Sequence, residues 1–132
     1  MNGKIIFCDT VQVSRMNGTT SANIKAPLNA IKPVAIPGNY SFAVYGCVTG
    51  IKHITDDEKL TFAVFMPDGS HQGDIEIPLK NTPLNEAGDE YRPVEIAIDF
   101  RNIVIPAEGE ITAVFSLDGS EICRSSIDVI KE

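Results

Sequence analysis

Side chains able to carry out nucleophilic chemistry are sparse in this sequence. It contains two histidines, His53 and His71, and three cysteines, Cys8, Cys47 and Cys123. Nucleophilic catalysis needs a nucleophile, a base and a group that orients the base, and the Gly-x-Ser-x-Gly elbow of hydrolases is absent. Cys47 and His53 could be imagined as a dyad, but a reactive thiol needs an electropositive surrounding that the sequence does not offer. We therefore predict no catalytic residues and a protein that is not an enzyme.

Oxygen ligands suited to calcium are more plentiful than ligands suited to zinc. Two acidic groups stand out, in residues 56–58 (Asp56, Asp57 and Glu58) and in residues 85–90 (Asn85, Glu86, Asp89 and Glu90). Neither group has the spacing of an EF-hand loop, and no four Cys, His or acidic residues lie close enough in the chain for zinc. We predict no metal site and no cofactor, with calcium binding by an acidic loop as the alternative.

Charge and hydropathy exclude two classes of partner. The chain of 132 residues carries a net charge of −7 and has a pI near 4.7. Its basic residues are scattered, which disfavours binding to nucleic acid or to an anionic membrane surface. No run approaches the roughly 18 apolar residues of a membrane helix, and residues 1–8 do not resemble a signal peptide. We expect a soluble, cytoplasmic protein whose three cysteines are small buried hydrophobic residues in a reducing compartment.

Short segments of alternating apolar and polar residues run along the whole chain, and no segment shows a sustained helical period. Turn signals separate them, at Asn17-Gly18, Pro67-Asp68-Gly69-Ser70, Pro106-Ala107-Glu108-Gly109 and Asp118-Gly119. The Asp118-Gly119 signal is the strongest and predicts a hairpin. The predicted strands cover residues 4–13, 24–36, 39–49, 59–66, 74–79, 94–105, 110–117 and 121–130.

Such a series of short strands predicts one antiparallel β-sandwich domain of seven to eight strands over residues 1–132. Three prolines mark residues 24–36 and their end as an edge or irregular strand. Asp9 falls on the apolar face of the first strand, so we expect a bulge or an edge position there. The outward residues of the last third, such as Glu95, Asp99 and Arg101, are expected to be solvated polar groups.

A surface for binding another molecule is suggested by aromatic residues on the wrong face of their strands. Tyr45 and Phe65, together with Ile6, lie opposite the main inward rows, so two aromatics would meet on an outer sheet face if their strands are neighbours. The acidic loop over residues 80–93 adds Glu86, Asp89, Glu90 and Tyr91 to this candidate interaction surface. The alternative is that these strands are buried on both sides or covered by the loop.

Three segments together resemble a known group of proteins. They are Ile-Ile-Phe-Cys-Asp at residues 5–9, Pro-Gly-Asn-Tyr-Ser-Phe at 37–42, and Phe-Arg-Asn-Ile-Val-Ile-Pro-Ala-Glu-Gly-Glu at 100–110, which runs into Leu-Asp-Gly-Ser-Glu. In these segments the chain is similar to uncharacterised bacterial proteins of about this length that form immunoglobulin-like β-sandwiches. The resemblance implies an immunoglobulin-like fold and a family of unknown function, and it implies no catalytic residue.

These observations favour a non-enzymatic protein-interaction or structural module that binds a protein partner or forms a homo-oligomer. The alternative is a β-sandwich module that binds a small ligand or carbohydrate with the help of calcium.

Overall fold

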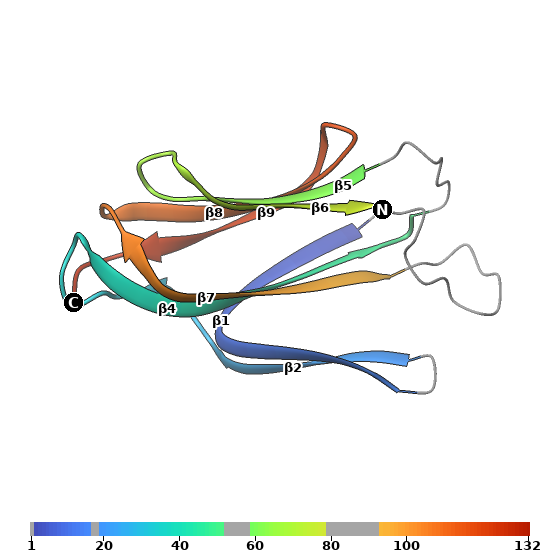
Figure 1. Cartoon of the computed structure of the whole chain (residues 1–132), viewed down its shortest axis with the longest axis horizontal. Coiled ribbons are helices and arrows are strands. Elements are labelled where there is room, and N and C mark those ends of the chain that lie inside the picture. Colours follow the sequence, from blue (N-terminus) through green and yellow to red (C-terminus); the bar gives the residue numbers. More distant parts are fainter. Residues whose placement is uncertain (1, 17–18, 52–58, 79–92) are drawn as a thin grey trace.

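Two β-sheets pack face to face and enclose the hydrophobic core (Figure 1). The computed structural model describes residues 2–16, 19–51, 59–78 and 93–132, and these residues contain strands and no helix. One sheet has the strand order β2-β1-β4-β7, with β1 Asn2–Met16, β2 Thr19–Pro27, β4 Gly38–Thr49 and β7 Val94–Ile105. The other has the order β3-β9-β8-β5-β6, with β3 Ala30–Ile31, β5 Lys59–Phe65, β6 His71–Pro78, β8 Gly109–Leu117 and β9 Ser120–Val129.

The predicted β-sandwich is confirmed, but the segment 24–36 differs from the prediction. Instead of one irregular strand, the chain forms the end of β2, which stops at Pro27, and the two-residue strand β3. β3 pairs with β9 in parallel orientation, whereas every other strand pair is antiparallel. The described residues therefore form nine strands, and the prolines explain why this edge is so short.

The core follows the predicted alternation. Phe42, Val44 and Val48 of β4 are fully buried against the five-stranded sheet. From that sheet Phe62 and Phe115 meet with their ring centroids 4.6 Å apart. Aromatic pairs at this spacing add to the stabilisation that burial of their area provides, so these rings strengthen the part of the core that the five-stranded sheet contributes.

The predicted turns at Asp118-Gly119 and Pro67–Ser70 are also confirmed, whereas Asn17-Gly18 lies outside the described residues. Asp118 and Gly119 both have positive φ, 47° and 82°, and they connect β8 to β9 through the pair Leu117 and Ser120. This is the backbone that a two-residue hairpin requires. The turn between β5 and β6 has Gly69 at φ 87°, and the Ser70 amide donates to Oδ1 of Asp68 over 3.0 Å.

The irregularity expected at Asp9 is a sharp bend of β1. Residues 2–8 of β1 pair with β4, whereas residues 8–16 pair with β2. Asp9 lies at the bend and is exposed, and Ala26 beside it on β2 has a φ of 52°. The bend takes a carboxylate out of the apolar row to which simple alternation would assign it, which avoids the cost of burying it.

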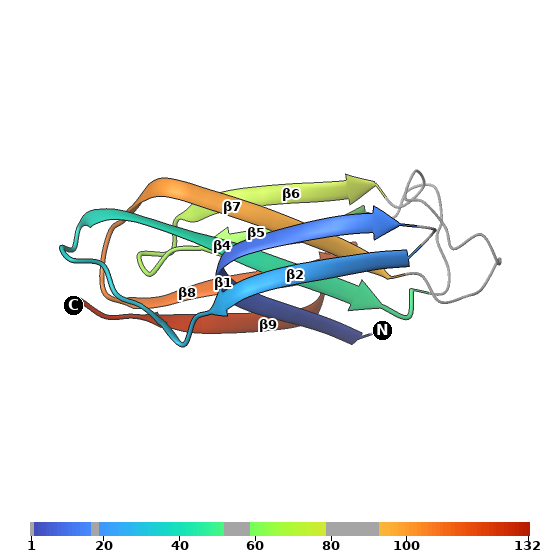
Figure 2. The same cartoon turned by 90° about the horizontal axis from the view of Figure 1, so that it is seen from below.

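The bend turns the rest of β1 back beneath its own sheet. Figures 1 and 2 show residues 10–16 of β1 and 19–25 of β2, here called the hairpin arm, lying under β4 and β7. β1 contacts β7 as well as β4, although β4 separates the two in the sheet. The polar segment 14–21, expected as a turn, is mostly strand, because Ser14 pairs with Ser21 and Met16 with Thr19.

Candidate functional site

The two aromatics of the predicted interaction surface lie in different sheets. Tyr45 belongs to β4 of the four-stranded sheet, and Phe65 belongs to β5 of the five-stranded sheet. Their strands are not neighbours, so the condition under which the two aromatics would meet on one outer face is not fulfilled. Sequence alternation assigns a residue to one face of its strand, but it does not say which strands share a sheet.

Tyr45 is buried, although it points away from the core between the sheets. Its side chain is only 6% exposed, and its neighbours on the same face of β4, Ala43 and Cys47, are buried as well. The hairpin arm lies beneath this face in Figure 1. Its register places the half-buried Val11 opposite Ile24, with the half-buried Ala22 two residues from Ile24 on the same face of the arm. The predicted exposure of Tyr45 is wrong, because the arm forms a third layer, and the alternative of a strand buried on both sides is correct.

A polar cluster lies between the four-stranded sheet and the hairpin arm. The Tyr45 hydroxyl donates to Oε1 of Glu95 over 2.7 Å. The strand register aligns Lys4 of β1, Cys47 of β4 and Glu95 of β7 in one row across the sheet. Glu95 was expected to be solvated, but its Oε2 is buried and has no hydrogen-bond partner among the described residues. Glu95 meets Tyr45 because of the register of β4 with β7, and the sequence does not reveal this register.

The electrostatics of this cluster favour the neutral forms of Tyr45 and Cys47. Burial and the hydrogen bond to Glu95 raise the pKa of Tyr45 far above its ordinary value. Burial also raises the pKa of the Cys47 thiol, with the Glu95 carboxylate acting in the same direction and Tyr45 and Lys4 opposing it. A protonated thiol is a poor nucleophile and a poor metal ligand, so the cluster is better suited to structure than to chemistry.

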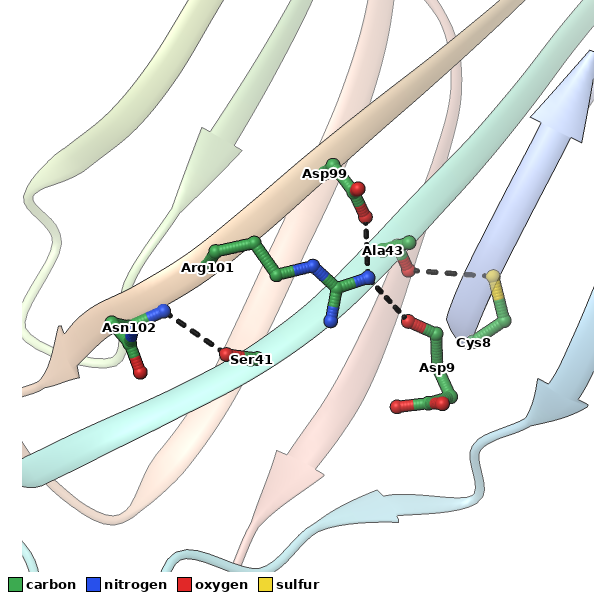
Figure 3. A network of polar contacts seen from close by, with 7 residues as sticks. All are labelled: Cys8, Asp9, Ser41, Ala43, Asp99, Arg101 and Asn102. Atoms are coloured by element: carbon green, nitrogen blue, oxygen red, sulfur yellow. Dashed lines mark hydrogen bonds and ion pairs between the residues drawn. The ribbon is translucent and has the colours of Figure 1, made fainter.

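A second set of polar contacts holds the bend of β1 against β7 (Figure 3). Arg101 donates from Nη2 to the Asp9 carbonyl over 3.0 Å and to Oδ1 of Asp99 over 2.7 Å. Nearby, the amide of Asn102, a residue with a φ of 55°, donates to Oγ of Ser41 over 3.0 Å. The Cys8 thiol lies 3.7 Å from the Ala43 carbonyl, and burial raises its pKa. These contacts link three strands at the base of the hairpin arm.

Phe65 lies on the outer face of the five-stranded sheet, where no described strand lies above it in Figure 1. It is half-buried, and its ring meets His71 edge-on with the centroids 4.4 Å apart. The register places Thr112 beside Phe65, and it places Val114 beside Ala63 one row further along the strands. This group of small, apolar and hydroxyl side chains, here called the outer patch, lies on the outer face of the five-stranded sheet.

The remaining candidate residues fall mostly outside the described part of the chain. Glu86, Asp89, Glu90 and Tyr91 lie there, as do His53 and the acidic residues 56–58. Within residues 2–16, 19–51, 59–78 and 93–132, no three His, Cys, Asp or Glu side chains come together as metal ligands would. His71 pairs instead with Asp74, with Nδ1 and Oδ2 2.8 Å apart.

The three cysteines are free, and two of them are buried as expected, while Cys123 is only partly buried. No helix that could cross a membrane occurs in the part of the chain that the structure describes.

Comparisons with known proteins agree with the resemblance seen in the sequence. The model of a family described as a family of unknown function (DUF6941) matches residues 4–130. No curated protein matches the chain. The crystal structure of an immunoglobulin-like protein from Pseudomonas aeruginosa is 16% identical, covering 96% of this chain and 97% of that one with a TM-score of 0.42. The two packed sheets themselves form the β-sandwich that the sequence predicted.

Proposed function

The chain belongs to DUF6941, a family of unknown function, and we propose that it is a non-enzymatic protein-interaction module that binds a protein partner through the outer patch of its five-stranded sheet. One observation carries this proposal. The outer face of the four-stranded sheet is covered by the chain's own hairpin arm, whereas the outer face of the five-stranded sheet has no described strand above it.

The composition of the outer patch suits a protein interface. Its centre combines Phe65, Ala63 and Val114, none of them charged. Ion pairs lie around this centre, Lys59 with Glu76 and Arg124 with Glu121. An apolar centre with few charges, surrounded by a polar rim, is the usual arrangement of a protein interface. Exposed ion pairs add little to the stability of the fold, so these charged side chains can instead contact a partner.

The absence of enzymatic activity in this proposal is supported by the thiols and the histidine. Burial raises the pKa of Cys8, Cys47 and Cys123, so the thiolate that nucleophilic catalysis requires is disfavoured at each. His71 is exposed and is paired with Asp74 on the outer face of the sheet. An interaction module needs none of these groups to be reactive.

A charge placed at the centre of the outer patch tests the proposal. Val114→Asp introduces a carboxylate between Ala63 and Arg124, the two register neighbours of Val114. We expect it to abolish binding, because a charge is costly to desolvate at the centre of an interface. Val104→Asp is the matched control, since Val104 is 56% exposed on β7 of the other sheet. Purified wild type and both variants would serve as baits for proteins of the source organism, and binding would then be remeasured with each purified partner.

Partners that bind the wild type and Val104→Asp, but not Val114→Asp, would support the proposal. It fails if Val114→Asp retains every partner or if the wild type binds none. A rise in Tm with a glycan or with calcium, in the absence of a protein partner, would favour the ligand-binding module instead.

A further inference from the structure

The free edge of the hairpin arm has a sequence that complements itself. Residues 10–16 of β1 pair with β2 on one side, and the pairing of β1 with β4 ends at Cys8. Within the described part of the chain, no strand occupies the other side of residues 10–16. We propose that this edge pairs antiparallel with the same edge of a second copy, and that the protein forms a two-fold symmetric dimer through β1.

An unpaired strand edge offers a row of free amide and carbonyl groups to any other strand. Proteins usually protect such edges with charges, prolines or bulges. The other long edges here carry these features, with Lys25 and Pro27 on β2, Asp74 and Glu76 on β6, and an irregularity opposite Tyr40 and Phe42 on β7. Residues 10–14, Thr-Val-Gln-Val-Ser, contain neither a charge nor a proline.

The order of residues around Gln12 identifies the second copy as the occupant of this edge. Residues 9–15 read Asp-Thr-Val-Gln-Val-Ser-Arg. Antiparallel pairing centred on Gln12 places Val11 opposite Val13 and Thr10 opposite Ser14 of the second copy. It also places Asp9 opposite Arg15, and the two-fold axis repeats each of these pairs. Apolar, hydroxyl and opposite-charge pairs are those that stabilise neighbouring strands, and self-complementarity is what a two-fold interface requires.

Burial and charge at the arm agree with this pairing. Val13 is 36% exposed and Val11 is half-buried, so apolar area remains to be covered on this strand. Each copy has a net charge of −7, but residues 10–27 contain two basic residues, Arg15 and Lys25, and no acidic one. Two acidic molecules repel each other least where their acidic residues are missing. The dimer does not rest on the outer patch, which lies on the other sheet.

The symmetric position of Gln12 provides the test. Gln12→Lys brings two like charges directly opposite each other at the two-fold axis, and we expect it to weaken dimerisation at least about fivefold. Asn23→Lys is the matched control, because Asn23 pairs with Gln12 inside the arm and is exposed in the same way. Sedimentation equilibrium of the full chain over a wide concentration range would measure the dimer dissociation constant.

A charge exchange between Asp9 and Arg15 tests the register. Asp9→Arg alone and Arg15→Asp alone each create two like-charge pairs across the axis, so each variant should dimerise less well than the wild type. Mixing the two variants restores both opposite-charge pairs, and the mixture should form heterodimers. Circular dichroism would check that each variant is folded.

The proposal is overturned if the wild type is monomeric at every concentration, or if Gln12→Lys dimerises as the wild type does. It is also overturned if Asn23→Lys weakens the dimer as much as Gln12→Lys. Failure of these tests would not affect the proposal that the outer patch binds a protein partner, because that proposal is tested with Val114→Asp on the other sheet.

Discussion

At the scale of single residues, the hydrogen bond from Tyr45 to Glu95 offsets part of the cost of burying the Glu95 carboxylate beneath the four-stranded sheet. Within the described part of the chain, Tyr45 donates the one hydrogen bond to the Glu95 carboxylate, and the other carboxylate oxygen is buried without a partner. A buried carboxylate is costly unless its oxygens accept hydrogen bonds. The hydroxyl of Tyr45 therefore stabilises the folded protein, because it donates to a carboxylate oxygen that is removed from water.

Removing that hydroxyl should destabilise the protein. We expect Tyr45→Phe to lower the free energy of unfolding by about 1–3 kcal/mol, because it leaves both oxygens of Glu95 without a protein donor. Tyr40→Phe is the control, since Tyr40 is half-buried on the same strand and its hydroxyl bonds to no described residue. Urea unfolding of both variants would measure the difference, and equal effects at the two positions would contradict the role of the hydrogen bond.

The same variant should change how stability depends on pH. The pKa of Tyr45 is raised above its ordinary value of 10.0 in the folded protein. Above pH 10 the unfolded chain loses this proton while the folded protein keeps it, so the free energy of unfolding falls as the pH rises. Tyr45→Phe should therefore show a shallower loss of stability above pH 10 than the wild type. Parallel curves for the two proteins would contradict the raised pKa.

At the scale of elements, the hairpin arm is the feature that distinguishes this sandwich. One strand, β1, joins the four-stranded sheet to the layer beneath it, and the change occurs within a few residues around Asp9. Ala26, on the other strand of this bend, adopts a left-handed φ of 52°. A residue with a Cβ is strained in that conformation.

Glycine at this position should relieve the strain. We expect Ala26→Gly to stabilise the protein by about 0.5–1 kcal/mol, because the left-handed conformation costs alanine more than glycine loses in chain entropy. Ala22→Gly, in a paired part of the same strand, should instead destabilise it by at least about 0.5 kcal/mol. Thermal unfolding monitored by circular dichroism would give both values, and a loss of stability in Ala26→Gly would show that the bend is not strained there.

At the scale of the whole molecule, the two sheets approach each other closely at Gly46, in the centre of the core. A Cβ placed on Gly46 of β4 would lie 2.5 Å from the ring of Phe115 on β8. Phe115 is fully buried and packs against Phe62, so it has little room to move. The separation of the sheets at the centre of the core therefore depends on the missing side chain.

An added methyl group at Gly46 should force the sheets apart or displace the ring. We expect Gly46→Ala to destabilise the protein by about 1–3 kcal/mol, which is the usual effect of overpacking a core. Gly73→Ala is the control, because its Cβ would lie 3.4 Å from Phe100, an ordinary contact, and should change stability by less than about 1 kcal/mol. Urea unfolding would compare the two, and tolerance of Gly46→Ala would mean that Phe115 can repack.

The strands and turns of this protein follow from local rules. Alternation places Phe42, Val44 and Val48 in the core, and the short turn at Asp118-Gly119 needs residues that tolerate positive φ. The charged side chain of Asp9 marks the irregular point of β1, because a carboxylate at that position of a regular strand would face the core. Each of these features depends on neighbours in the chain, so the sequence by itself determined them.

The candidate sites depend on contacts between residues that are far apart in the chain. The burial of Tyr45, its bond to Glu95 fifty residues later and the separation of Tyr45 from Phe65 all result from which strands pair and from the hairpin arm folding under its own sheet. Alternation specifies the face of a strand but not its neighbours or the layer beneath it. Only the tertiary structure decided those, because strand pairing reflects the packing of the whole molecule rather than the preference of any one segment.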